Sequence, residues 1–167
     1  MGEAKVGEEF ITHEFDEAIA VQQSIVEAET TLSTKHPLGS AKRALKASLA
    51  DDEAFLEQLR TLGKEHDATG KVEDVAGGLK KLMEETLDTA TTEGEDSDFY
   101  EAHAVLLNLK RKQMDSAGGM LKVARAQKDT ELRDAAVAFE RAQKATSKTL
   151  AAELATYAVQ IAGSASR

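Results

Sequence analysis

The stretch that decides the fold is EEFITHEFDEAIAVQQSIVEAETTL, residues 8–32. Its apolar side chains recur mostly at intervals of three and four, which gathers them on one face of an α-helix. These side chains are Ile11, Phe15, Ala18, Ile25, Ala28 and Leu32. The pattern predicts a long amphipathic helix that ends before Pro37, because proline disfavours helix in the residue preceding it.

The same helical period continues along the chain and predicts four long helices, at 8–32, 38–63, 98–128 and 130–162. Between the second and third lies a shorter helical pattern over 72–90, weakened in its middle by two adjacent glycines. A simple up-and-down bundle does not need so long a connection, whereas a bundle with one crossover does. The expected fold is therefore all-α, a ferritin-like four-helix bundle with a long crossover containing a short helix.

One helical-bundle domain is expected to span residues 1–167, with residues 1–7 and 163–167 flexible at its ends. The inner stripes of the four helices predict which large side chains are buried together. They are Phe15, Ile25, Leu49, Phe55, Leu59, Leu106, Leu109, Phe139 and Leu150. Aromatic residues make up only 4% of the chain, a composition that suits closely spaced helices better than a β-sandwich.

Composition excludes several classes of function. The net charge of −9 argues against a nucleic-acid binder, which needs a concentrated basic surface. The absence of cysteine removes disulfides, thiolate metal sites and cysteine nucleophiles. No apolar run is long enough to span a membrane, and the first residues lack a hydrophobic signal segment, so we expect a cytoplasmic location. No phosphate-binding loop, nucleophile elbow or His-Glu-x-x-His helix is present.

Four polar residues interrupt the inner stripes, one on each long helix: Gln22, Asp52, Gln113 and Gln143. Buried polar groups cost free energy unless they form hydrogen bonds, so these residues predict a polar layer across the bundle. Three amides and one carboxylate carry too little negative charge for two divalent ions. The layer is either a hydrogen-bonded amide layer, a row at the edge of the stripes, or a weak site for one metal or small ligand near Asp52.

Three segments carry a resemblance to a known family: FDEAIAVQQ at 15–23, DEAFLEQLRTLG at 52–63 and VAGGL at 75–79. In these segments the chain resembles the bacterial ferritin-like proteins typified by YciE and YciF, over about residues 10–155. The resemblance implies a ferritin-like fold, a dimeric habit and a role in a bacterial stress response. It also implies a site for two iron or manganese ions, if the family's ligands are present.

The metal ligands of the family do not carry over completely. Its first-helix glutamate falls on Val21 or Gln22, and its pair of third-helix carboxylates falls near Lys110 and Gln113. A protonated lysine cannot ligate a metal. Glu140 matches a carboxylate of the last helix, and Asp52 or Glu53 matches one of the second helix. The resemblance therefore supports the fold more than it supports metal chemistry.

The histidines add no obvious ligand set. His13 lies one turn before Glu17, a spacing that favours an exposed ion pair over a metal ligand. His36 precedes Pro37 in a turn, His66 lies in a polar loop, and His103 borders an inner stripe as a packing residue.

These observations leave three hypotheses. The first is a non-catalytic, metal-deficient ferritin-like bundle without a cofactor, which acts through protein contacts and forms a homodimer through its helix faces. The second is a di-iron or di-manganese protein whose ligands come from other carboxylates: Glu17, Glu53, Glu57 and Glu140. The third is a helical interaction module unrelated to ferritins, favoured if the long connector forms a fifth bundle helix of its own.

Overall fold

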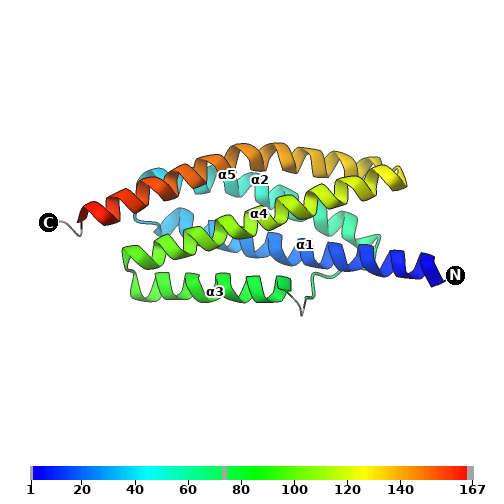
Figure 1. Cartoon of the computed structure of the whole chain (residues 1–167), viewed down its shortest axis with the longest axis horizontal. Coiled ribbons are helices and arrows are strands. Elements are labelled where there is room, and N and C mark those ends of the chain that lie inside the picture. Colours follow the sequence, from blue (N-terminus) through cyan, green and yellow to red (C-terminus); the bar gives the residue numbers. More distant parts are fainter. Residues whose placement is uncertain (1, 73–74, 165–167) are drawn as a thin grey trace.

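The computed structural model describes residues 2–72 and 75–164, which form five helices packed against one another (Figure 1). They are α1 (Gly2–Lys35), α2 (Gly39–Lys64), α3 (Val75–Glu93), α4 (Asp96–Gln127) and α5 (Thr130–Ser164). Those residues contain no strand, so the all-α prediction is confirmed. None of the described helices is both long and apolar enough to cross a membrane.

Four of the helices form a ring in which α1 packs on α2, α2 on α5, α5 on α4 and α4 on α1. Neighbours in this ring run in opposite directions (Figure 1). Helices α2 and α4 run in the same direction and lie across a diagonal of the ring, where long side chains join them. The connection between them is therefore the long one, and it contains α3.

Helix α3 covers the groove between α1 and α4 on the outside of the ring. Its 19 residues make it the shortest helix, as expected, but it lies at Val75–Glu93 instead of 72–90. Its buried residues Ala76, Met83 and Ala90 belong to the same apolar cluster as the ring helices. The connector thus contains a fifth helix of the expected length, which adds to the core despite the glycine pair in its first turn.

Some of the helix ends lie where the sequence predicts them and others do not. Helix α1 begins at Gly2, so the prediction that it starts at residue 8 is wrong by almost two turns. It ends before Pro37, as expected. Helix α4 follows Glu95 as its N-terminal cap. Helix α5 begins after Asp129, whose carboxylate accepts a hydrogen bond from the backbone of Leu132 at 3.0 Å.

The core has two apolar parts, separated along the bundle axis. One lies around Ile25, Leu45, Leu106 and Leu150, at the end of the ring that α3 covers. The other lies around Phe15, at the opposite end, and includes the stacked rings of Phe55 and Phe139. Eight of the nine side chains expected in the core are buried. Leu49 is only partly buried, because its neighbours Ser48 and Asp52 take the inner positions on α2.

Candidate functional site

A polar layer fills the space between the two apolar cores, and Asp52 is its centre. Gln22 of α1 donates from Nε2 to Oδ1 of Asp52 at 2.8 Å and to its backbone carbonyl at 3.0 Å. Gln143 of α5 donates to the same Oδ1 at 2.7 Å. All three residues are completely buried. Three of the four polar residues found in the sequence therefore meet at one carboxylate.

Gln113, the fourth of these polar residues, is also buried, but its side chain bonds to a backbone group of α1. Its Nε2 donates to the backbone carbonyl of Ala18 on α1 at 2.7 Å. The side chain that α4 sends to Asp52 is Lys110, one turn earlier. Gln113 therefore fixes α4 against α1 beside the layer and does not bond to Asp52 in the structure.

Lys110 was not among the residues expected in the interior, but it occupies the middle of the layer. Its ammonium donates to Oδ2 of Asp52 at 2.6 Å, to Oε1 of Glu29 at 2.9 Å and to Oγ of Ser48 at 2.9 Å. The side chains of Lys110, Glu29 and Asp52 are all fully buried. The three donors of the ammonium thus find three acceptors, which a buried cation requires.

The cluster contains two carboxylates but only one ammonium. Ser48 donates to Oδ2 of Asp52 at 3.0 Å, so both oxygens of that carboxylate receive hydrogen bonds. Burial raises the pKa of Glu29 to about 8, against the opposing effect of Lys110. Lys110 and Asp52 therefore form the shortest ion pair of the cluster, at 2.6 Å, whereas burial favours the protonated form of Glu29.

Several acceptor oxygens in the layer have no hydrogen-bond partner among the described residues. They are Oε2 of Glu29 and the side-chain oxygens of Gln22, Gln113 and Gln143. Carboxylate and amide oxygens are suitable ligands for a hard cation. The ammonium of Lys110 lies in the same layer, but its hydrogen bonds go to other atoms than these four oxygens.

The carboxylates of the dimetal alternative do not come together in the structure. They are Glu17, Glu53, Glu57 and Glu140. Glu53 and Glu57 are exposed, Glu140 pairs with Lys144 on its own helix, and Glu17 pairs with Lys112 of α4. None of them reaches Asp52 through a contact that the structure records.

A second buried polar group joins the turn after α1 to α4 and α5. Nε2 of His36 lies 3.2 Å from Nδ1 of His103, and Nε2 of His103 lies 3.0 Å from the carbonyl of Leu150. The backbone N–H of Leu38 donates to Nδ1 of His36 at 3.1 Å. The carbonyl only accepts, so both rings are assigned as neutral with the proton on Nε2.

The surroundings of this pair keep it uncharged. Burial lowers the pKa of His36 to about 4, and His103 and Lys42 lower it further, against the opposing effect of Asp96. Burial also lowers the pKa of His103. The ring of Tyr157 packs on His36 with centroids 4.7 Å apart, and its hydroxyl donates to Asp96 at 2.7 Å.

A groove of about 530 Å³ lies between α2 and α5. It is lined by Glu57, Gln58, Thr61, Leu62, Glu131, Asp134 and Ala135, none of which belongs to the polar layer. This groove is thus separate from the layer, where Asp52 and Lys110 bond to the buried groups around them.

Comparisons of this chain with protein-family models, with curated proteins and with solved structures give no match.

Proposed function

We propose that this chain is a metal-free bundle of the ferritin-like type that acts through protein contacts, and that Lys110 occupies the place of the metal ions. The observation that carries the proposal is the complete pairing of the Lys110 ammonium with Glu29, Ser48 and Asp52 in the middle of the helix ring. An internal ammonium neutralises the buried carboxylate without any ion taken from solution.

The arrangement of the helices supports the ferritin-like part of this proposal. The ring joins two antiparallel pairs, α1 with α2 and α4 with α5, through one long connection. A bundle with a single crossover has this order. The fifth helix in the connector is the feature that favours an unrelated helical module, although α3 packs outside the ring and not within it.

The contacts that we propose involve a second copy of the chain and the last third of α5. No charged residue occurs from Leu154 to Ser164, and Val159 is 74% exposed there. Ala151, Ala155 and Val159 follow one another at intervals of four and are all exposed, so they form an uncharged face. In a chain of net charge −9, two copies repel each other least where they meet through such a face.

A charge on this face is expected to weaken the dimer. Val159→Glu should raise the dimer dissociation constant by at least about tenfold, because a buried, unpaired carboxylate costs more than about 1.4 kcal/mol. Sedimentation velocity over a concentration series measures this constant. Ala138→Glu, which adds the same charge to an exposed site near the other end of α5, should leave it unchanged. A parent protein that is monomeric throughout the series would contradict the dimer.

The metal-free part of the proposal is tested by Lys110→Glu. This change removes the ammonium and places a third carboxylate beside Glu29 and Asp52, so the variant should be destabilised without metal by repulsion among buried carboxylates. Mn²⁺ at about a hundred times its dissociation constant should then raise Tm by roughly 5–10 °C. Thermal unfolding with chelator and with Mn²⁺ measures both effects.

Two controls make this result specific. Lys122→Glu makes the same substitution at an exposed position of α4 and should show no response to Mn²⁺. The parent and all variants also carry His13→Asn, which removes the imidazole from a surface cluster of His13, Glu14 and Glu17. The proposal fails if Mn²⁺ stabilises the parent as much as the Lys110 variant, or if a folded Lys110 variant does not respond to Mn²⁺.

A further inference from the structure

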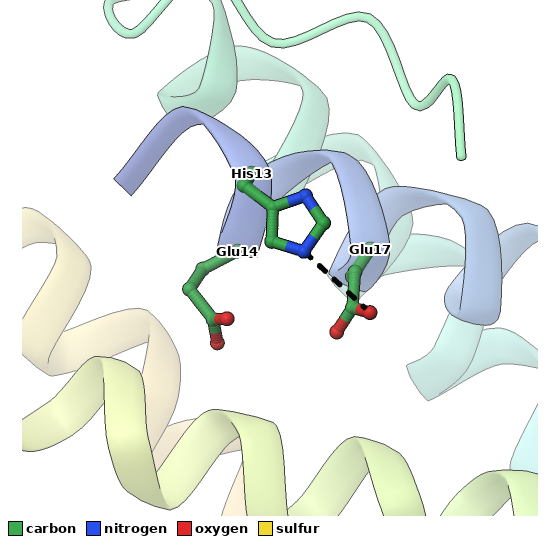
Figure 2. Close-up of side chains that lie close together, drawn as sticks. All are labelled: His13, Glu14 and Glu17. Carbon is green, nitrogen blue, oxygen red and sulfur yellow. Dashed lines mark ion pairs between the residues drawn. The ribbon is translucent and has the colours of Figure 1, made fainter. Parts of the chain in front are cut away.

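Three potential metal-ligating side chains converge on the surface of α1, far along the helix from the Lys110 cluster. His13, Glu14 and Glu17 each offer one ligand atom, and these atoms all lie within 4.8 Å of one another. Nε2 of His13 is 3.9 Å from Oε1 of Glu17 (Figure 2). The two glutamates point to the same side of the helix as the imidazole ring.

These separations are close to those of a bound zinc ion. Ligand bonds of about 2.0–2.2 Å in a tetrahedral site place neighbouring ligand atoms about 3.4 Å apart. The 3.9 Å between His13 and Glu17 is already near this value, and the other separations, which are within 4.8 Å, have to shorten when an ion binds. An imidazole nitrogen with two carboxylate oxygens also favours Zn²⁺ over Mg²⁺, which prefers oxygen ligands and keeps its waters.

The site is partly held in place by the neighbouring elements. Glu17 is 14% exposed in its side chain, and its Oε2 accepts from Lys112 of α4 at 3.1 Å. Its other oxygen, Oε1, is the one that faces His13. A partner on one carboxylate oxygen orients the other toward a metal, as outer contacts do in known metal sites.

The same turn of α1 is also held against the connector. Thr12 donates to the backbone carbonyl of His66 at 2.8 Å. Asp16 accepts from the backbone N–H groups of Thr69 and Gly70 at 2.7 Å and 2.8 Å. Gly70 has φ of +79°, and a Cβ there would lie 2.7 Å from Ile19, so the glycine is needed for this close approach. The helix turn that carries the three ligands is therefore fixed on both sides.

We infer that His13, Glu14 and Glu17 form a surface site for one zinc-like divalent transition-metal ion, distinct from the metal-free interior. The three side chains leave at least one coordination position to water or to a group of another molecule. The ion pair of His13 and Glu17 expected from the sequence is present. Glu14 adds the third ligand that a simple ion pair lacks.

In the test, chelator first removes any bound metal from the full chain. The chain is then titrated with ZnCl₂ in an isothermal titration calorimeter. One zinc per chain is expected. His13→Asn and Glu17→Gln should each weaken binding by about tenfold or more, since loss of a ligand costs at least as much as loss of its outer partner. His13 is exposed, so its variant should keep the parent's helical content by circular dichroism.

Matched controls separate this site from other zinc binding. Glu27→Gln removes an exposed carboxylate from the same helix and should leave binding unchanged. His36 and His103 are fully buried, so His66 is the other histidine that zinc reaches easily, and His66→Asn should also leave binding unchanged. The inference is wrong if zinc does not bind, if His13→Asn binds as tightly as the parent, or if binding depends on His66. Zinc lost with Asp52→Asn but kept with His13→Asn would contradict both this site and the metal-free interior.

Discussion

Lys110→Met is expected to lower the free energy of unfolding by about 3–5 kcal/mol at pH 7. Methionine keeps most of the length of the side chain but removes the ammonium, which leaves the buried carboxylate of Asp52 without its cation. Ser48 loses its contact with the ammonium as well. An uncompensated charge in the interior is among the few causes of so large an effect from one substitution.

Urea unfolding of the parent and the variant measures this difference. Lys148→Met, at an exposed position of α5, is the control and should change stability by less than about 0.5 kcal/mol. A double-mutant cycle should show stronger coupling of Lys110 to Asp52 than to Glu29, because the Asp52 contact is shorter, at 2.6 Å against 2.9 Å, and burial raises the pKa of Glu29. Equal losses in the Lys110 and Lys148 variants would show that the ammonium is not paired in the interior.

The pair of buried histidines is expected to make the fold sensitive to acid. His36 has an ordinary pKa of 6.5 and a folded-state pKa of about 4, so the unfolded chain binds more protons between these values. The contribution of neutral His36 to the free energy of unfolding is complete above pH 6.5 and is lost as the pH falls toward 4. The loss amounts to about 3 kcal/mol, and the lowered pKa of His103 adds to it.

Glu29 has the opposite dependence and must be separated from the histidines. Its folded-state pKa of about 8 lies above the ordinary 4.5, so its contribution is complete below pH 4.5 and is lost as the pH rises toward 8. Urea unfolding at several pH values should therefore compare the parent with His36→Gln and with Glu29→Gln. The difference in free energy of unfolding between the parent and His36→Gln should change by about 3 kcal/mol from pH 7 to pH 4. Parallel pH profiles for these two proteins would refute the expectation.

The polar layer was only partly predictable from the sequence. The helical period fixes which side chains face inward, and it correctly placed Gln22, Asp52, Gln113 and Gln143 in the interior. Lys110 and Glu29 were missed because lysine and glutamate are rarely buried. The signal was nevertheless present, since Glu29 lies between Ile25 and Leu32 on one stripe and Lys110 lies one turn after Leu106 on another. Two opposite charges on facing inner stripes predict a buried pair.

Other features depend on contacts between distant segments and leave no periodic signal. The burial of His36 arises because the turn around Pro37 packs against α4 and α5. The length of α3 was predicted correctly, but the helix lies three residues later than expected. Gly77 and Gly78 lower helix propensity locally, whereas Ala76 and Met83 gain from packing against the ring. Such tertiary contacts override local propensity and become visible only in the folded chain.

The position of the polar layer between two apolar cores also determines the axial register of the helices. A slip of α2 by one turn would move Asp52 about 5.4 Å along the bundle and away from Gln22, Lys110 and Gln143 together. Apolar side chains made of leucine and alanine tolerate such a slip, because one apolar contact replaces another. A buried carboxylate and ammonium do not, since each loses its partner in the interior. The layer thus selects one alignment of the helices from several of similar hydrophobic burial.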